Sequence, residues 1–142
     1  MAIKYYEQWY DILNNFSAHA VEIDGVVYPT AEHAYQAAKC TDKKGKTEIA
    51  AARSPLGAKE ISNKKYEHAK DPDWDNKKLE AMERVYRAKL AQHPLVREAL
   101  IRSGDEEIIE DSPVDYFWGG GKDGSGENHL GKLWMKLRAE LT

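Results

Sequence analysis

The 142-residue sequence predicts a predominantly helical α+β fold with one small antiparallel β element. A hairpin signal and several segments with helical spacing and cap residues carry this prediction. The length suits one buried core, so we expect a single domain over residues 1–142. Hydrophobic residues make up 42% and charged residues 32% of the chain, which is typical of an ordered globular protein.

The β element is predicted between residues 21 and 28. Val21–Ile23 and Val26–Tyr28 are short runs rich in β-branched residues, and Asp24-Gly25 joins them. Both positions of such a two-residue turn need positive φ, which Asp-Gly tolerates. Thr30 can then cap a helix that runs from residue 31 to about residue 40.

Helix start signals recur in the middle of the chain. Ser54-Pro55 combines a cap residue with a proline at the first helical position. Asp73 can cap a helix from residue 74 to about residue 92, because apolar positions repeat there at spacings of three and four. We expect its buried face to comprise Leu79, Met82, Tyr86 and Leu90.

Two helices and a short strand are predicted in the C-terminal third. Pro94 opens a helix through Leu95, Ala99 and Leu100, and Gly104 closes it. Residues 108–109, both isoleucine, predict a short strand. Asn128 can cap a final helix. The apolar side of that helix is expected to comprise Leu130, Leu133, Trp134, Leu137 and Leu141.

Composition disfavours several classes of protein. The one cysteine, Cys40, rules out an internal disulfide and fits a reducing compartment, so we expect a cytoplasmic protein. The five histidines show no zinc-ligand spacing, and we expect neither a metal nor a cofactor. Residues 1–10 lack the apolar stretch of a signal peptide, and no apolar run is long enough to span a membrane. A net charge of −3 gives no global basic field for long nucleic acids.

The strongest local signal lies in the helix predicted after the hairpin. Glu32, Gln36 and Lys39 are spaced by four and three residues and share one helical face. Burial of this face would lower the pKa of Lys39 and make it a nucleophilic amine. The plain alternative is a surface helix with scattered charges. Close packing is favoured by four alanines, Ala31, Ala34, Ala37 and Ala38.

A second constellation begins at Asp115. This acid and the aromatic residues Tyr116, Phe117 and Trp118 run directly into residues 119–126, which hold five of the ten glycines. A glycine segment that leads into a helix can present N–H groups to a phosphate. It matches neither the P-loop nor the dinucleotide fingerprint. A mobile surface loop is the plain alternative, but the preceding acid and aromatics favour a ligand site.

These blocks, in this order along nearly the whole chain, resemble the NADAR family, also called YbiA-like. The Pro-Thr-x-Glu-His motif at residues 29–33 and the Asp-x-x-Trp-Gly-x-Gly motif at residues 115–121 are together highly specific. The family often has an arginine shortly before the tryptophan matched to Trp74, where this chain has Lys70-Asp71-Pro72-Asp73. Other matching positions are Asn15-Phe16, Asp24-Gly25, Tyr28, residues 34–39, Met82, residues 89–92, Gly124, Asn128, Leu130-Gly131 and Leu137-Arg138.

The resemblance implies a YbiA-like N-glycosidase that cuts ribose from an exocyclic amine without a cofactor. Some family members cleave ribosylamino-pyrimidine intermediates of riboflavin synthesis. Others remove ADP-ribose from guanine in DNA, sometimes as antitoxins to a DNA-modifying toxin. We expect ADP-ribosylated guanine in single-stranded DNA as the substrate and a ribosylamino nucleotide as the alternative. From a different class, a non-catalytic ADP-ribose binder or an antitoxin that contacts a toxin partner stays open.

The family's functional residues fall on both constellations when they are carried over by position. Catalytic roles go to Glu32, Lys39 and Asp115. Ligand contacts are assigned to Tyr35, Trp74, Trp118, Gly119, Gly121 and Asn128. In one mechanism Lys39 displaces the amine by transimination while Glu32 or Asp115 moves protons. In the other, a carboxylate activates water against an oxocarbenium-like sugar. We favour the Schiff base.

Overall fold

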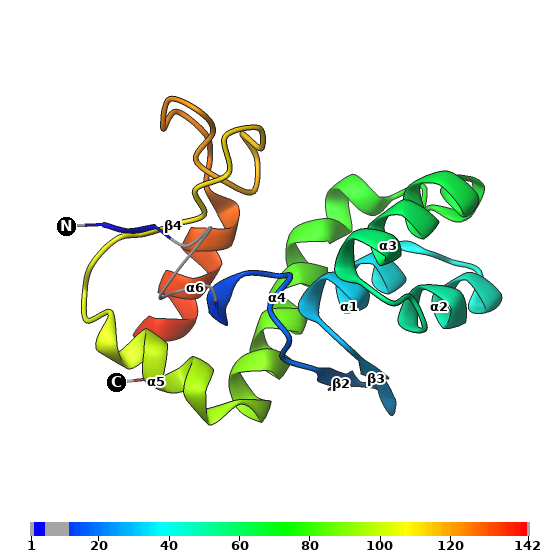
Figure 1. Cartoon of the computed structure of the whole chain (residues 1–142). Helices are drawn as coiled ribbons and strands as arrows, with labels where there is room; N and C mark the ends of the chain where they lie inside the picture. The colour runs from blue at the N-terminus through cyan, green and yellow to red at the C-terminus, as the bar shows by residue number, and fades with distance from the viewer. Residues whose placement is uncertain (1, 5–11, 142) are drawn as a thin grey trace. The chain divides into compact units, whose positions relative to one another are not determined.

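The computed structural model of the chain describes residues 2–4 and 12–141 (Figure 1). Its described residues form two compact units. We call Asn15–Gln92 the hairpin–helix unit, and the described residues of Met1–Asn14 with His93–Thr142 the glycine-loop unit. A single domain over residues 1–142 therefore stays a prediction. The expected absence of a signal peptide concerns residues 1–10, most of which lie outside the described residues.

The predicted hairpin is confirmed in the hairpin–helix unit. Strands β2 (Val21–Ile23) and β3 (Val26–Tyr28) pair antiparallel, with Val21 opposite Tyr28. Asp24 and Gly25 both have positive φ, 53° and 81°, as the two-residue turn requires. Gln92 fixes the hairpin from outside: its Nε2 donates to Glu22 O at 2.9 Å and its Oε1 accepts from Glu22 N at 2.8 Å.

Helix α1 (Ala31–Lys39) is packed against three other helices of the same unit, α2 (Lys43–Ala50), α3 (Pro55–Glu60) and α4 (Trp74–Gln92). Thr30 caps α1 as predicted, because its side chain accepts a hydrogen bond from His33 N at 3.2 Å. Ser54 likewise caps α3 through Gly57 N. The sequence did not predict α2, which Asp42 caps. The helical elements of this unit are α1 (Ala31–Lys39), α2 (Lys43–Ala50), α3 (Pro55–Glu60), a π-helix η2 (Ile61–Lys65), a 3₁₀ helix η3 (Glu67–Ala69) and α4 (Trp74–Gln92).

Small residues let α1 and α2 approach each other closely. Ala31 and Ala37 are fully buried, as the alanine content predicted, although Ala38 is exposed. A Cβ at Gly45 of α2 would lie 2.6 Å from Cys40 Sγ, so only glycine fits there. The core of the unit is completed by Ile49, Ala58, Tyr66 and Ala69.

The buried face of α4 differs in part from the prediction. Met82 and Tyr86 are buried as expected, whereas Leu79 is 40% exposed and Leu90 is half-buried. The buried stripe instead includes Lys89, whose Nζ donates to Ser17 Oγ at 2.7 Å. The spacing of apolar residues could not predict this buried face of α4, because a buried lysine depends on a polar partner from a distant segment of the chain.

The glycine-loop unit combines a two-stranded parallel pair with helices. Strand β1 (Ile3–Lys4) pairs in parallel with β4 (Ile108–Ile109), and helix α6 (His129–Ala139) packs against β4. Helix α5 (Pro94–Arg102) packs against α6. The strand at residues 108–109 is confirmed; its parallel pairing was not predicted.

The predicted apolar faces of α5 and α6 are largely confirmed. Leu100 is buried, but Leu95 is 64% exposed and Val96 takes its place in the interior. On α6 the buried residues are Leu130, Gly131, Leu133, Trp134 and Leu137, while Leu141 lies beyond the helix end. Within residues 2–4 and 12–141, no helix is long and apolar enough to cross a membrane.

Replacing the α1 cap should destabilise the protein. Thr30→Ala removes the acceptor of His33 N and the contact of Thr30 Oγ1 with His33 Nδ1 at 2.8 Å. We expect a loss of about 1–2 kcal/mol in the free energy of unfolding, measured by urea denaturation. Thr30→Ser keeps the hydroxyl and serves as the control. Equal stability of the alanine and serine variants would contradict the capping role.

Candidate active site

The predicted shared face of α1 carries a buried acid. Glu32 is only 8% exposed, and its Oε2 accepts a hydrogen bond from Gln36 Nε2 at 2.7 Å. Its backbone N–H donates to Asn15 O at 3.0 Å, which fixes the first turn of the helix. The i, i+4 spacing thus joins Glu32 and Gln36 directly, as the helical period requires.

Burial changes the acidity of Glu32. Loss of water raises the pKa of its carboxyl above the ordinary value, because the charged form is the one that burial penalises. The hydrogen bond from Gln36 and the charges of Lys59 and Lys39 act in the opposite direction. Glu32 is therefore suited to hold a proton that an ordinary surface glutamate would have lost.

Lys39 lies at the other end of α1 and is half-buried. Its Nζ donates to Asn63 Oδ1 at 2.6 Å. Burial lowers the pKa of Lys39, and the nearby positive charge of Lys70 lowers it further, while Glu32 opposes the shift. More of this amine is neutral at a given pH than for an exposed lysine, which is the condition for a nucleophile.

Two predicted ligand contacts, Tyr35 and Trp74, form an aromatic pair. Their ring centroids are 5.3 Å apart with an interplanar angle of 55°. Both are buried, with 8% and 5% of their surface exposed. The contact joins α1 to the start of α4, so it also contributes to packing.

Sequence reasoning missed Asn63, the partner of Lys39. It lies on the π-helix η2, and π-helical turns occur often at functional sites. No local sequence pattern marks it, because it meets Lys39 only through the packing of η2 on α1. Asp71 is one of the acids that depart from the family pattern. Its backbone N–H donates to Lys39 O at 2.9 Å, whereas its side chain pairs with Lys77, whose Nζ lies 2.9 Å from Oδ2.

The predicted acid Asp115 holds a tight turn in the glycine-loop unit. Its Oδ1 accepts hydrogen bonds from Phe117 N at 3.0 Å and Trp118 N at 2.7 Å. Trp118 is half-buried, and its ring meets the ring of Phe117 edge-on at 4.8 Å. The structure therefore brings Asp115 and Trp118 together through the backbone.

The glycine segment is held by defined contacts, unlike a mobile surface loop. Gly120 N donates to Glu110 O at 2.8 Å, and Gly126 N donates to Gly120 O at 2.7 Å. A Cβ at Gly119 would lie 2.1 Å from Glu110 Oε2. Gly121 has a φ of 73° and packs on the Tyr116 ring. Several of the N–H groups expected to bind a phosphate are thus already paired.

Asn128 precedes α6, but its side chain does not cap the helix. Its Oδ1 accepts from Glu110 N at 2.9 Å and its Nδ2 donates to Ile108 O at 2.9 Å. The predicted helix start at Asn128 is therefore confirmed, and the predicted cap by its side chain is wrong. Asn128 adopts a left-handed backbone conformation, with φ 54°, in which its amide instead fastens the end of β4.

Glu110 is a second buried acid that sequence reasoning missed. It is 9% exposed, and burial raises its pKa to about 7. Ser112 N donates to Glu110 Oε2 at 3.2 Å and lowers the pKa, whereas the charges of Asp115 and Asp111 raise it. Strand alternation is the signal that could have found it, because Glu110 lies two residues after the buried Ile108 and so on the same face.

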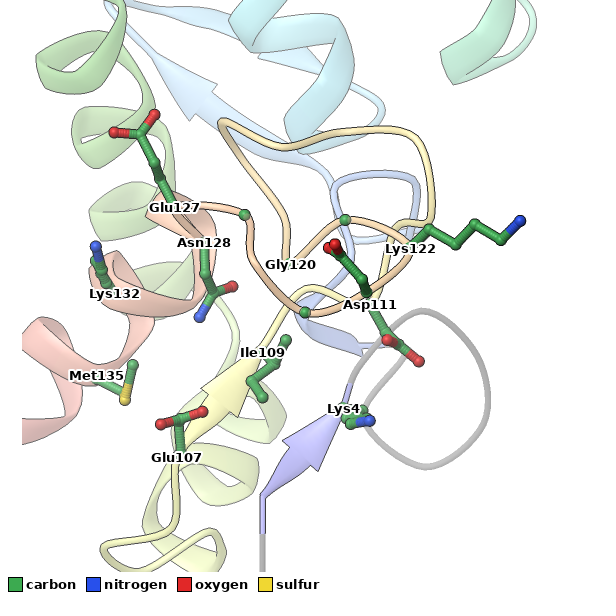
Figure 2. A pocket seen from close by; sticks show the side chains of 14 residues that line it. Lys4, Glu107, Ile109, Asp111, Gly120, Lys122, Glu127, Asn128, Lys132 and Met135 are labelled. Carbon is green, nitrogen blue, oxygen red and sulfur yellow. The ribbon is translucent and has the colours of Figure 1, made fainter.

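Figure 2 shows a pocket of about 470 Å³ in the glycine-loop unit. Ile109 of β4 and Met135 of α6 form part of its wall. Of the predicted ligand contacts, Gly121 and Asn128 line it, and Trp118 and Gly119 are not among its lining residues. Charges of both signs surround it: Lys4, Glu107, Asp111, Lys122, Asp123, Glu127 and Lys132.

The side chains that could bind a metal ion do not form a cluster in the part of the chain that the structure describes. Among the residues that the structure describes, no group of three or more His, Cys, Asp or Glu side chains could hold a metal ion. Cys40 is buried and its Sγ contacts Asp42 O at 3.5 Å. This thiol packs in the core between α1 and α2.

Comparison with known proteins assigns the enzyme class. An N-glycosidase of Nostoc punctiforme is 36% identical over 146 residues, which cover 99% of this chain and 93% of that protein. The N-glycosidase YbiA of Escherichia coli is 34% identical over 132 residues, which cover 93% of this chain and 82% of YbiA. The NMR structure of YbiA superposes with a TM-score of 0.88 at 33% identity, over 99% of this chain and 84% of that chain. The chain is an enzyme of the N-glycosidase class.

The family follows from the same comparisons. The sequence model described as the NADAR domain matches residues 2–142, and the chain belongs to this family. The match runs through both units. A riboflavin biosynthesis protein of Vibrio vulnificus is 34% identical over 129 residues, which cover 91% of this chain and 35% of that longer protein.

The raised pKa of Glu110 predicts that this residue makes the free energy of unfolding depend on pH. A carboxyl whose pKa is about 7 when folded and 4.5 as a model value binds its proton more tightly in the folded state. The contribution of Glu110 to stability should therefore fall as the pH rises from about 4.5 to about 7, and Glu110→Gln should lack this contribution. Urea denaturation at pH 4.5 and pH 8 measures it, with the exposed Glu127→Gln as control. An equal pH dependence in wild type and Glu110→Gln would contradict the buried-acid account.

Proposed function

We propose that the chain hydrolyses the bond between C1 of a ribose and an exocyclic amine. The observation that supports this most directly is the pair of tuned groups on α1. A buried carboxyl with a raised pKa and a half-buried amine with a lowered pKa lie on one helix. Acid–base and nucleophilic catalysis need these two states near neutral pH.

Ring opening is the first step of the proposed mechanism. Protonated Glu32 gives its proton to the ring oxygen of the ribose while the bond from C1 to that oxygen breaks. The lone pair of the exocyclic amine forms the C1–nitrogen double bond, which leaves an iminium ion at C1. Glu32 is then a carboxylate, and the raised pKa of its carboxyl favours the return of a proton.

Exchange of the amine follows. The neutral Nζ of Lys39 adds to C1, and a proton moves from Nζ to the nitrogen of the base. The bond from C1 to the base breaks, and the base leaves as a free amine while C1 and Nζ form an iminium ion. Water then adds to C1, and Glu32 takes a proton from it. The proton of the new C1 hydroxyl then moves to Nζ, the C1–Nζ bond breaks and C1 becomes the aldehyde of the open sugar, which frees the neutral amine of Lys39 and releases the sugar.

ADP-ribosylated guanine in single-stranded DNA is the substrate that we propose. Family positions assign ligand contacts to Tyr35 and Trp74 in the hairpin–helix unit and to Trp118 in the glycine-loop unit, and aromatic rings of this kind can wall a base or sugar. Asp115 would assist proton transfer, and Gly119, Gly121 and Asn128 would contact the ligand, as family positions imply. A toxin that installs the modification is the partner that this substrate implies.

A ribosylamino-pyrimidine is the second candidate substrate. It carries the same ribose-to-exocyclic-amine bond, so the same residues would act on it. The specific observation in its favour is the name of the Vibrio vulnificus relative, a riboflavin biosynthesis protein. The net charge of −3 also suits a small substrate better than long DNA.

Turnover on both substrates side by side tests the proposed function. We expect release of ADP-ribose from modified guanine, measured by chromatography, with no added metal and no effect of EDTA. Exclusive cleavage of the ribosylamino-pyrimidine would make the second candidate the substrate. Loss of activity on chelation would overturn the metal-free mechanism, and cleavage of neither substrate would overturn the proposal.

Trapping tests the covalent step. Borohydride added during turnover should reduce the imine and fix the sugar on Lys39, which peptide mass spectrometry would locate. Lys39→Arg keeps a positive charge, but a guanidinium stays protonated and cannot readily form the imine. The kcat of this variant should therefore fall at least about a hundredfold, while the variant still binds the product sugar. Lys46→Arg is the matched control, because burial also lowers the pKa of Lys46 and its Nζ donates to Ala37 O.

The two mechanisms give different trapping results. Direct attack by water predicts no adduct and partial tolerance of arginine at position 39. A full-rate Lys39→Arg variant without a trapped species would therefore exclude the Schiff base.

A further inference from the structure

We propose that Gln36 positions both Glu32 and the substrate: its Nε2 orients the Glu32 carboxylate, and its Oε1 accepts a hydrogen bond from an O–H or N–H of the bound ribosylamine. This inference rests on the proposed function and adds a residue to it. Gln36 lies on α1 between Glu32 and Lys39, on the face that the two share.

The first half of the proposal follows from the Glu32–Gln36 hydrogen bond. Gln36 is 3% exposed, and the 2.7 Å from its Nε2 to Glu32 Oε2 is short for an amide donor. A carboxylate held by a buried amide keeps one orientation, which a proton shuttle requires.

A second residue also acts on the Glu32 carboxyl. Asn15 also forms a hydrogen bond with the Glu32 side chain. Its own amide is fixed by the Tyr86 hydroxyl, which donates to Asn15 Oδ1, and by Met82 Sδ at 3.7 Å from Nδ2. Asn15 is therefore committed to the fold, whereas the amide of Gln36 keeps one end available.

The available end is Gln36 Oε1. Among the described residues it is the one buried side-chain nitrogen or oxygen without a hydrogen-bond partner. A buried acceptor without a donor costs free energy, and such atoms call for an explanation. Other buried polar groups of α1 are paired: both ring nitrogens of His33 have partners, Thr30 Oγ1 and Ala52 O.

A ribosylamine offers the donors that Oε1 lacks. Its 2-hydroxyl and its exocyclic N–H lie next to C1, the atom that Lys39 attacks in the proposed mechanism. A hydrogen bond from one of them would place C1 relative to Glu32 and Lys39, the groups that flank Gln36 on the helix. A site with a buried polar group also rejects ligands that leave it unpaired.

Gln36→Met tests both halves, because methionine keeps the length of the side chain and removes both hydrogen-bonding atoms. Gln92→Met is the matched control, since it also removes two hydrogen bonds of a glutamine in the same unit, but these bonds go to Glu22 of β2 and not to a residue of α1. The Glu32 carboxyl carbon is titrated by ¹³C NMR in each variant, and kcat and KM are measured on the substrate that wild type cleaves.

We expect Gln36→Met to raise the pKa of Glu32 further, because the lost donor stabilised the charged form. The charges of Lys59 and Lys39, which also act on Glu32, stay in place. We also expect kcat/KM to fall at least about tenfold, with KM rising as the substrate loses an acceptor. Gln92→Met should leave the Glu32 titration and KM unchanged.

An unchanged Glu32 titration in Gln36→Met would overturn the orienting role, and an unchanged KM would overturn the substrate contact. Equal effects in the two methionine variants would reduce Gln36 to a stabilising residue. Cleavage of neither substrate by wild type would end the proposed function and the substrate contact with it. The hydrogen bond to Glu32 would still stand or fall on the NMR titration alone.

Discussion

Helix α1 packs so closely against its neighbours that part of its polar face loses water. Ala31 and Ala37 on α1 and Gly45 on α2 allow this approach. Once water is excluded, Glu32 resists ionisation and Lys39 gives up its proton more readily. The packing that forms the core of the hairpin–helix unit is thus also what tunes its two reactive groups.

The same constraint makes every polar contact of α1 consequential. Burial must be offset by a partner, which Gln36 and Asn15 provide for Glu32 and Asn63 provides for Lys39. The glycine-loop unit uses its polar side chains differently, since Asp115 and Asn128 mainly bind backbone groups. Its buried acid is Glu110, which sequence reasoning missed.

Local signals predicted the local structure well. The Asp24-Gly25 hairpin, the Thr30 cap and the bounds of α4 follow from turn chemistry, capping and helical spacing, and all are confirmed. The i, i+4 rule also placed Glu32 and Gln36 side by side. Features that depend on contacts between distant segments were missed, among them the buried Lys89 with Ser17 and the Asn63 partner of Lys39. The side-chain role of Asn128 was predicted wrongly, because an asparagine amide can cap a helix or bind the backbone of a strand equally well.

Burial on α1 makes Lys39 a weaker base than an exposed lysine. A ¹³C NMR titration of the Lys39 Cε resonance tests it without any substrate. We expect a pKa below 10.5 in the folded protein, a higher pKa in Lys70→Gln because a neighbouring positive charge is removed, and the ordinary value after unfolding in urea. A folded Lys39 that titrates at or above 10.5 would contradict this effect of burial.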